Sequence, residues 1–236
     1  MTNRFEGKTA LIAGGTGGLG RAVTVAFLQE GARVGVTYRA EQELQSLQAA
    51  AGTNASFLTG WRADVTNEKE MADVVQKIGS LDILVNAVGG YAGGTALWDT
   101  ASETFERMML LNVRSGFVLA RLIVPAMVQR GAGSVVNIAS RAAVDHAAGA
   151  SAYAASKAAA VAMMDSLAAD VLGHGVRVNT VLPSIIDTEA NRKAMPGADF
   201  TKWPKPEEIA RVILFLCSDD AKLIHGASIP VYGANG

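Results

Sequence analysis

The sequence predicts an α/β protein whose single domain is a doubly wound, seven-stranded parallel sheet with helices on both faces. Apolar, strand-like runs alternate with helical patterns from one end of the 236-residue chain to the other. The central runs, such as 83-ILVNAV-88 and 134-SVVNIA-139, are apolar on both faces instead of alternating, which is typical of strands covered by helices on both sides. Right-handed crossovers would then place ligands at the carboxyl ends of these strands.

The expected elements follow in regular order along the chain. Strands are expected at Thr9–Ala13, Arg33–Tyr38, Ser56–Arg62, Ile83–Asn86, Ser134–Ala139, Arg177–Leu182 and Ser228–Val231. Helical patterns lie between them, near 18–30, 41–51, 67–79, 103–130, 152–172 and 206–218. No linker, low-complexity tract or internal repeat interrupts this order, so one domain is expected over residues 1–236.

Composition narrows the class of protein. Half of the residues are hydrophobic and the formal net charge is −1, so no basic surface for nucleic acid or acidic membranes is expected. The uncharged run 83–98 is shorter than a bilayer span, and the N-terminal residues lack an apolar signal core. The single cysteine, Cys217, excludes an internal disulfide and suits a reducing compartment. We expect a cytoplasmic protein without a membrane or nucleic-acid partner.

The stretch 11-LIAGGTGGLGRA-22 contains five glycines within seven residues. A buried strand precedes it and a helical pattern follows it, and these three parts form the opening of a Rossmann-like dinucleotide-binding unit. In such a unit, backbone N–H groups and the helix N-terminus receive a pyrophosphate. Two registers fit the stretch: G-x-G-x-x-G as 15-GTGGLG-20, and G-x-x-x-G-x-G with Gly14, Gly18 and Gly20. The stretch alone leaves both open.

A second signal is 153-YAASK-157, which places Tyr153 and Lys157 four residues apart on one helix face. Ser140 ends the apolar strand 134-SVVNIAS-140, so its hydroxyl is expected at the carboxyl edge of the sheet, where ligands of doubly wound sheets bind. Asn112 is a polar residue inside an otherwise apolar helical pattern. Taken alone, Asn112 is interpreted as a hydrogen-bonded helix residue, and a Tyr–Lys pair at this spacing is common by chance.

Together, these stretches resemble the short-chain dehydrogenase/reductase family over essentially the whole chain. The matching stretches are 14-GGTGGLG-20, 63-ADV-65, 86-NAVG-89, Asn112, Ser140, 153-YAASK-157 and 183-PSIIDT-188. The resemblance favours the longer glycine register. It implies a catalytic tetrad formed by Asn112, Ser140, Tyr153 and Lys157.

The same resemblance implies a cofactor site along the strand ends. Its residues would be Gly14, Thr16, Gly18, Leu19, Gly20, Tyr38, Arg39, Asp64, Val65, Asn86, Ala87, Tyr153, Lys157, Pro183, Ile186 and Thr188. Within this set, Asp64 and Val65 would border the adenine and Asn86 would line the cleft. Ile186 and Thr188 would meet the nicotinamide amide.

Three positions depart from the family pattern. Ala13 replaces the threonine usual before the first glycine, Ala87 replaces the second asparagine of the usual N-N-A-G, and Ser184 replaces the glycine usual after the proline. The first two are expected to loosen hydrogen bonds that brace the cofactor strands. None of the three removes a catalytic group.

Acid–base chemistry gives the tetrad its roles. An ordinary tyrosine has a pKa near ~10, too high for efficient proton exchange at neutral pH. The ammonium of Lys157 and an oxidised nicotinamide ring are expected to favour the phenolate and lower the pKa of Tyr153. Tyr153 would protonate the alkoxide as hydride reaches a carbonyl carbon, and Ser140 would donate a hydrogen bond to the same oxygen. Lys157 would also hold the nicotinamide ribose, and Asn112 would hold a water that links Lys157 to solvent.

Cofactor choice is expected to depend on the end of the second strand. An NAD-selective unit places an acidic residue about 20 residues beyond the glycine loop. Here 34-VGVTYRAE-41 places Tyr38 and Arg39 at that point, and the first acid, Glu41, falls in the next helix. Because a guanidinium can hold a 2′-phosphate bidentately, NADP(H) is predicted to be preferred over NAD(H). The alternative interpretation is a solvated arginine at a strand end.

The substrate side of the site carries weaker signals. The segment 188–206 has proline, glycine and mixed charge, and it is interpreted as a mobile lid, with an ordinary surface connection as the alternative. Met195 and Trp203 would be apolar contacts of this lid. His146 falls between Ser140 and Tyr153, where the family resemblance places substrate-facing residues. No histidine pairs with cysteine or carboxylates at metal-binding spacing, so no metal is expected.

The predicted function is NAD(P)(H)-dependent interconversion of a carbonyl and a secondary alcohol by hydride transfer, with Tyr153 as acid/base. One alternative is a 3-oxoacyl-thioester (acyl carrier protein) reductase of fatty-acid synthesis, for which Arg141 alone is thin support. An alternative of another class is a non-catalytic NAD(P)-sensing regulator, although such a protein has no need of Tyr153. A sugar epimerase or dehydratase would usually need a larger C-terminal substrate domain.

The alanine-rich stretch 152-AYAASKAAAVAMMDSLAADVL-172 predicts an assembly of several copies. Small side chains on more than one face allow another helix to approach closely. The family resemblance implies a homotetramer or homodimer in which this helix and the 103–130 helix pack against their copies.

Overall fold

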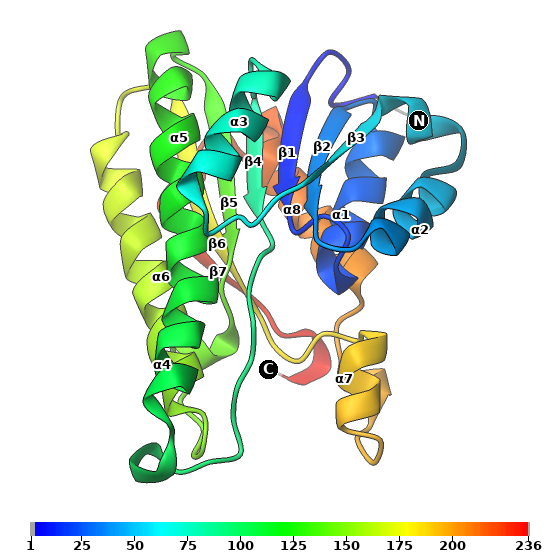
Figure 1. The fold of residues 1–236 in the computed structure, drawn as a ribbon. Helices are drawn as coiled ribbons and strands as arrows, with labels where there is room; N and C mark the ends of the chain where they lie inside the picture. The colour runs from blue at the N-terminus through cyan, green and yellow to red at the C-terminus, as the bar shows by residue number, and fades with distance from the viewer. Residues whose placement is uncertain (1–2, 236) are drawn as a thin grey trace.

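The computed structural model describes residues 3–235, and these fold into one doubly wound α/β sandwich (Figure 1). The seven strands of this described part form one sheet in the order β3-β2-β1-β4-β5-β6-β7, and every neighbouring pair is parallel. The strands are β1 (Thr9–Ala13), β2 (Arg33–Tyr38), β3 (Leu58–Arg62), β4 (Ile83–Asn86), β5 (Gly133–Ile138), β6 (Val176–Pro183) and β7 (Ser228–Val231). The helices are α1 (Gly18–Gln29), α2 (Glu41–Ala51), α3 (Glu68–Ile78), α4 (Ser102–Met109), α5 (Ser115–Arg130), α6 (Ser151–Asp170), α7 (Glu189–Ala194) and α8 (Pro206–Cys217). The predicted fold class is confirmed.

Three differences from the expected elements are informative. The expected helix 103–130 consists of α4, a π-helical turn at Leu110–Arg114, and α5. The strand expected from Ser56 begins at Leu58, because a 3₁₀ turn occupies Gly52–Phe57. The segment expected to be a lid contains the short helix α7, which its proline and mixed charge did not reveal.

Two hydrophobic cores lie on the two faces of the sheet. Residues of β1 alternate between them: Ala10 and Ile12 face the core built with α1, α2 and α8, whereas Leu11 and Ala13 face the core built with α3, α5 and α6. Figure 1 shows these helix layers on opposite sides of the sheet. Burial on both faces explains why the strands are apolar throughout. Cys217 lies in the first core, where burial raises the pKa of its thiol to about 12, so it is a packing residue.

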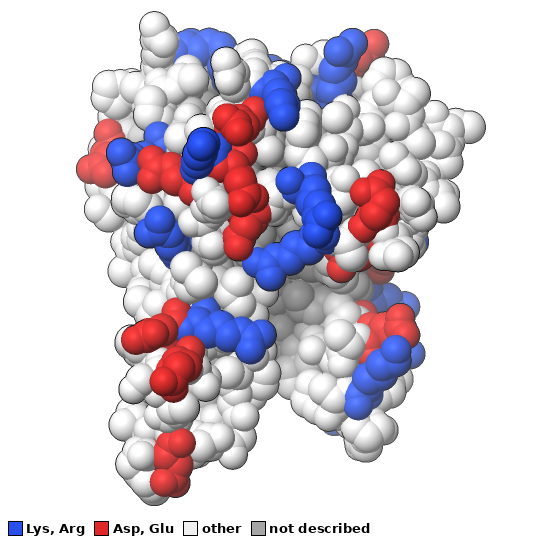
Figure 2. Space-filling view, viewed as in Figure 1, with Lys and Arg blue, Asp and Glu red and all other residues white. Residues whose placement is uncertain are grey.

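The crossovers bring the carboxyl ends of the strands to one edge of the sheet. Strand β1 lies between β2 and β4, so the chain runs outward from β1 in both directions and leaves a crevice where the direction changes. Figure 2 shows the surface hollowed below these strand ends, with Lys and Arg side chains along the upper rim of the hollow. The residues predicted to form the site follow the ends of β1 to β6, and the fold therefore gathers them around this hollow.

One helical stretch of the described residues, Ser102–Arg130, is long and apolar enough to cross a bilayer by length and composition. It comprises α4 and α5, and residues of α5 such as Leu119, Ile123 and Met127 are buried in the second core. The core helix of a globular protein passes the same test, so this stretch does not by itself indicate a membrane segment.

Candidate active site

The backbone angles and the steric room at each glycine of the loop between β1 and α1 bear on which of the two possible registers applies. Gly14 has a left-handed φ of 73°, a conformation that favours glycine. A Cβ on Gly20 would collide with the Gly14 carbonyl oxygen, and a Cβ on Gly18 would lie 2.9 Å from Thr188 Cγ2. By contrast, a Cβ on Gly17 would make only an ordinary contact. Gly20 is common to both registers, and a Cβ on Gly15 of the shorter register would collide with Val36 Cγ1. The left-handed Gly14, the close approach at Gly18 and the room at Gly17 therefore favour the longer register.

Helix α1 starts with backbone donors that no side chain caps. Its N-cap residue is Gly17, which offers no side-chain acceptor, and its first turn contains no acidic residue. Uncapped N–H groups at a helix N-terminus attract anions such as a pyrophosphate. Of the flanking residues predicted to bind cofactor, Thr16 donates its hydroxyl to the Glu43 carboxylate at 3.1 Å, and Leu19 is buried in the first core.

The two alanines that depart from the family pattern are joined through their backbones. The N–H of Ala87 donates to the carbonyl of Ala13 at 3.0 Å. The buried Thr37 adds a further brace, because its hydroxyl accepts a 2.9 Å hydrogen bond from the Gly14 N–H. The expected loosening of the cofactor strands is thus offset by a side chain on β2 that the motif does not contain.

Asn86 is buried, and its side chain holds strands together. Its amide donates to Asn137 Oδ1 at 3.0 Å, and its own Oδ1 accepts from the Val88 N–H at 3.2 Å. The Asn86 side chain was expected to line the cleft, but its polar atoms are used inside the protein. Among the residues expected to border the adenine, Val65 is likewise buried, at 5% exposure.

A hollow of about 410 Å³ lies at the ends of β2 and β3, on the side where the adenosine half of a dinucleotide is expected. The lining residues are Tyr38, Arg39, Arg62, Ala63, Asp64 and Glu70. Arg62 was not singled out from the sequence. It enters the hollow because β2 and β3 pair in a register that sets Tyr38 opposite Arg62, and that pairing is a long-range feature of the fold.

Arg39 is the charged group that the sequence predicted for this hollow. Its guanidinium is exposed and lies 3.6 Å from the Asp64 carboxylate. The Thr66 N–H, 2.9 Å from that carboxylate, lowers the pKa of Asp64, and the Thr66 hydroxyl and Arg39 add to the lowering. Glu41, the nearest acid beyond the strand, accepts a 2.8 Å hydrogen bond from the Tyr38 hydroxyl.

Ser140 and Tyr153 meet at the carboxyl edge of the sheet. Ser140 follows β5 and caps a short 3₁₀ turn by accepting a 3.2 Å hydrogen bond from the Ala142 N–H. Tyr153 lies in the first turn of α6, with its hydroxyl close enough to Ser140 for the serine to lower the pKa of the phenol. The ring of Tyr91 packs edge-on against the Tyr153 ring, with centroids 5.0 Å apart. Sequence reasoning missed Tyr91, because no local pattern links the loop after β4 to α6.

Lys157 lies one turn further along α6 and is only 5% exposed. Its Nζ donates to the Ile138 carbonyl at 3.0 Å and lies 6.0 Å from the centroid of the Tyr153 ring. Burial lowers the pKa of Lys157 to about 8. A Cβ on Gly89 would lie 3.1 Å from this Nζ, so glycine at that position keeps room for the lysine head.

The pKa of Tyr153 differs from the sequence-based expectation. Burial of the phenol raises this pKa above its ordinary 10.0, the nearby Ser140 hydroxyl lowers it, and Tyr91 raises it further. The net shift of the Tyr153 pKa is upward, because burial of the phenol outweighs the effect of Ser140. The Nζ of Lys157 is directed to the Ile138 carbonyl instead of the phenol. A lowered Tyr153 pKa therefore requires a further positive charge, such as an oxidised nicotinamide.

Asn112 lies in the π-helical turn Leu110–Arg114, a distortion that is frequent at functional sites. Its side chain is buried and fully engaged: Oδ1 accepts from the Gly90 N–H at 2.9 Å, and Nδ2 donates to the Gly90 carbonyl at 3.1 Å and to the Ser156 hydroxyl at 2.9 Å. Ser156 in turn donates to the Tyr153 carbonyl at 2.7 Å. Asn112 thus ties the loop after β4 to the helix that carries Tyr153. Sequence reasoning did not find Ser156.

The loop after β6 brings the predicted nicotinamide residues to the same edge. Pro183 ends β6 and pairs with Val231 of β7. Thr188 caps α7 by accepting a 3.2 Å hydrogen bond from the Asn191 N–H, and the Ile186 carbonyl accepts from the Asn191 side chain at 2.8 Å. These bonds fix the path of the loop beside the glycine turn, where Gly18 faces Thr188.

Ser184 fastens this loop to the end of the chain. Its hydroxyl donates to the Tyr232 carbonyl at 2.8 Å, and the Tyr232 ring lies 5.0 Å below the Arg141 guanidinium. Arg141 also pairs with Asp145 at 2.8 Å. The C-terminal segment therefore joins the loop after β6 to the loop that carries Ser140, a contact that no sequence motif indicated.

The three residues predicted on the substrate side have different positions. His146 is exposed in the loop between β5 and α6, and Met195 is half-buried directly after α7. Trp203 is 7% exposed and packs on Phe200, with ring centroids 4.9 Å apart. Trp203, predicted as an apolar contact of the lid, thus packs within the segment 188–206, and a contact with substrate stays a prediction.

Comparison with known proteins places the whole chain among one group of enzymes. A family model described as short chain dehydrogenase matches residues 8–199. The chain is 32% identical over 242 residues to a 3-oxoacyl-[acyl-carrier-protein] reductase of Thermotoga maritima, covering 98% of each chain. It is 32% identical to a 7alpha-hydroxysteroid dehydrogenase of Escherichia coli, covering 98% of this chain and 94% of the relative. A solved short chain dehydrogenase/reductase family protein superposes with a TM-score of 0.90 at 33% identity, covering 98% of this chain and 99% of that one.

Proposed function

The chain belongs to the short-chain dehydrogenase family, and we propose that it is an NADP(H)-preferring enzyme that acts on a small ketone or secondary alcohol. Membership makes the protein an NAD(P)(H)-dependent oxidoreductase of C=O and CH–OH groups. The observation that supports the residue assignment is the meeting of Ser140 with Tyr153, one helical turn from the buried Lys157, at the carboxyl edge of the sheet.

The glycine turn and α1 fit the dinucleotide that this chemistry requires. The cradle is narrow, because a Cβ on Gly18 would press on Thr188, and the first turn of α1 offers uncapped N–H groups without an acidic side chain. Both features suit a pyrophosphate. When bound, the cofactor supplies or receives the hydride, and the protein orients it and adjusts the charge around it.

Tyr153 is assigned as the group that exchanges a proton with the substrate oxygen. In the reducing direction its hydroxyl donates a proton to the oxygen as negative charge develops there. Ser140, which lies beside Tyr153, donates a hydrogen bond to the same oxygen and stabilises that charge. In the oxidising direction the same two groups act in reverse.

Lys157 and Asn112 are assigned supporting roles. Lys157 holds a ribose hydroxyl of the cofactor and, with the pKa of its ammonium near 8, moves a proton readily at neutral to mildly alkaline pH. Asn112 positions the helix of Tyr153 through Ser156. The water that was expected to connect Lys157 to solvent stays a proposal, because the Asn112 side chain bonds to Gly90 and Ser156.

The preference for NADP(H) is supported by the charges at the ends of β2 and β3. Arg39 and Arg62 both line the hollow there, and Tyr38 holds the nearest acid beyond the strand, Glu41. A 2′-phosphate would meet these guanidinium groups, whereas the two acids of the same hollow, Asp64 and Glu70, follow β3 and not β2.

The substrate is proposed only as a class, because relatives of equal identity differ in what their names say they act on. One is a reductase of an acyl-carrier thioester and another is a steroid dehydrogenase, each 32% identical to this chain. The thioester reductase stays plausible but is not favoured. Since the relatives are named reductases and dehydrogenases, a purely sensing role is not proposed.

Three further assignments extend this proposal. Residues 1–236 would act as one catalytic domain, and residues 188–206 as a lid that is braced by the Arg192–Asp187 ion pair. The enzyme would work as a homotetramer or homodimer. Its compartment would be the cytoplasm, consistent with the single buried thiol.

The test is a screen of NADPH and NADH oxidation against ketones, quinones and acyl thioesters. We expect turnover of at least one carbonyl with NADPH and a lower kcat/KM with NADH. A wild-type enzyme that oxidises neither cofactor with any carbonyl, nor reduces NADP⁺ with the matching alcohols, would contradict the proposal.

A further inference from the structure

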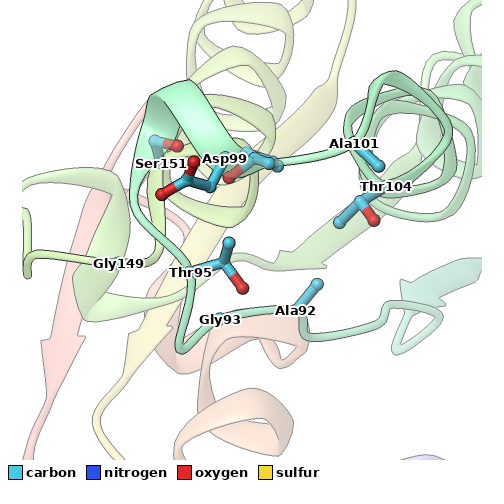
Figure 3. A pocket seen from close by; sticks show the side chains of 10 residues that line it. Ala92, Gly93, Thr95, Asp99, Ala101, Thr104, Gly149 and Ser151 are labelled. Atoms are coloured by element: carbon cyan, nitrogen blue, oxygen red, sulfur yellow. The ribbon is translucent and has the colours of Figure 1, made fainter.

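A second hollow, of about 310 Å³, lies beside the catalytic helix and outside the residues assigned so far (Figure 3). Its walls come from the loop after β4, the start of α4 and the start of α6. Its volume is in the range of small-molecule sites. The lining residues are Ala92, Gly93, Thr95, Asp99, Thr100, Ala101, Thr104, Gly149, Ser151 and Ala152.

The lining of this hollow is polar and made of small side chains. Apart from glycine and alanine, it contains only threonine, serine and one aspartate, so it offers no large apolar wall. Figure 3 shows that Asp99 and Thr95 of the loop after β4 and Ser151 of α6 all contribute polar side chains to this hollow. Within residues 3–235, Thr100 donates its hydroxyl to the Ala96 carbonyl, whereas Asp99 makes no ion pair. The hollow therefore offers a solvent-exposed carboxylate without an ion-pair partner, together with hydroxyl groups.

The hollow adjoins the reacting centre. Ser151 and Ala152 directly precede Tyr153 on α6. Tyr91 stands at the boundary: its ring packs on Tyr153, and a Cβ on Gly93, which lines the hollow, would collide with the Tyr91 hydroxyl. Because 70% of Tyr91 is exposed, its ring can turn without unpacking the core. A substrate whose carbonyl lies at Tyr153 can extend its far end past Tyr91 into the hollow.

We propose that this hollow binds the end of the substrate remote from the carbonyl, and that this end carries hydroxyl groups or an ammonium group. An aliphatic chain would desolvate Asp99 and the threonine hydroxyls without supplying partners, which costs free energy. An anionic end would be repelled by Asp99. Hydroxyl and ammonium groups instead donate to the carboxylate. The inference rests on the proposed function and names the substrate class for that site.

The test compares four-carbon ketones that differ in their substituents: L-erythrulose with three hydroxyls, 2-butanone with none, and acetoacetate with a carboxylate. With NADPH, we expect kcat/KM for L-erythrulose to exceed that for 2-butanone and for acetoacetate by at least tenfold. Asp99→Asn should lower kcat/KM for L-erythrulose about fivefold or more, mainly through KM, and leave 2-butanone within about twofold. An effect on kcat/KM that is confined to the hydroxylated substrate is expected when one charged hydrogen bond to that substrate is lost.

Matched variants separate this role from general damage. Asp73→Asn removes an exposed carboxylate on α3, away from the hollow, and should change neither substrate. Thr95→Val keeps the shape of a lining side chain and removes its hydroxyl, and it should weaken L-erythrulose selectively. The proposal is overturned if 2-butanone or acetoacetate is the better substrate, or if Asp99→Asn affects L-erythrulose and 2-butanone equally.

A binding measurement keeps the two proposals distinguishable. Saturation-transfer NMR with erythritol and the NADP⁺-loaded Tyr153→Phe protein should show binding that Asp99→Asn abolishes. Turnover of 2-butanone without erythritol binding would refute the proposed role of the hollow in substrate binding and leave the proposed function standing. Erythritol binding that depends on Asp99, without turnover of any carbonyl, would refute the proposed function alone.

Discussion

At the level of single residues, Lys157 carries the clearest electrostatic consequence. Burial lowers its pKa from the ordinary 10.5 to about 8, so between these pH values the unfolded chain binds a proton that the folded protein does not. The free-energy cost of burying the Lys157 ammonium is therefore absent above about pH 10.5 and present in full below about pH 8. The free energy of unfolding falls as the pH falls between these values. The difference of about 2.5 units corresponds to about 3 kcal/mol.

We expect the free energy of unfolding of the wild type, relative to Lys157→Met, to rise by about 3 kcal/mol between pH 7.5 and 10.5. Urea unfolding of both proteins at several pH values measures this difference, and the subtraction removes the titration of Cys217 and of exposed groups. A difference that stays flat across this range would show that Lys157 is hydrated in the native protein.

Tyr153 can be tested by removing one oxygen. Tyr153→Phe keeps the ring that packs on Tyr91 and loses the hydroxyl that lies beside Ser140. We expect kcat to fall by about 10²-fold or more, because general acid–base catalysis contributes that much, while the Kd for NADPH changes less than about twofold. Stopped-flow turnover and fluorescence titration give the two quantities. Retention of most of the wild-type kcat would exclude Tyr153 as the proton donor.

Arg39 determines the cofactor prediction. Arg39→Ala should raise the KM for NADPH roughly tenfold, as losing a charged hydrogen bond of ~1.5–3 kcal/mol would, and leave the KM for NADH nearly unchanged. Arg62→Ala, on the neighbouring strand, should act in the same direction. Arg33→Ala is the matched control, because it removes an exposed arginine from the opposite end of β2. An equal effect of Arg39→Ala on both cofactors would mean that Arg39 does not recognise the 2′-phosphate.

Helices and strands that depend on local sequence spacing were predicted well, whereas features that depend on contacts between distant residues were not. Strand β4 and helix α2 have the bounds that periodicity predicted, because the spacing of neighbouring apolar residues indicates which face of a strand or helix is buried. The π-helical turn around Asn112 was not predictable, since its apolar pattern continues that of a regular helix. It becomes visible only through the bonds from Asn112 to Gly90 and Ser156.

The same reasoning explains which site residues were found and which were not. Tyr153, Lys157 and Ser140 belong to local motifs, whereas Tyr91 and Tyr232 reach the site from distant segments. Tyr232 arrives because β7 pairs with β6, so that the end of the chain lies beside the residue that follows Pro183. Sequence patterns without an alignment carry no information about such pairings.

Ser184 offers a test of this long-range contact. Ser184→Ala removes the 2.8 Å hydrogen bond to the Tyr232 carbonyl, so the free energy of unfolding should fall by about 1 kcal/mol. Hydrogen exchange of amides in 230–235 and 184–188 should accelerate together, while exchange in β1 stays unchanged. Acceleration of one segment without the other would show that the bond does not couple them.

For the whole molecule, the outer face of α6 carries a pattern that an isolated chain does not explain. The exposed alanines Ala155, Ala162 and Ala169 recur every seven residues and therefore share one face of the helix. On α4 and α5 of the same layer, Phe105 and Phe117 are each 47% exposed. Small residues beside exposed aromatic rings suit close packing against a second copy, and a two-fold interface uses the same patch on both copies.

We expect sedimentation at micromolar concentration to show a tetramer or dimer, because burying this layer against its copy removes apolar area from water. Ala162→Arg places a long charged side chain at the centre of the alanine row and should shift the protein to a smaller species with unchanged far-UV circular dichroism. Ala49→Arg is the matched control, since Ala49 is an exposed alanine on α2, in the opposite helix layer. A wild type that sediments only as a monomer would contradict the proposed assembly. A multimer that tolerates Ala162→Arg but is broken by Ala49→Arg would place the interface on the other layer of the sandwich.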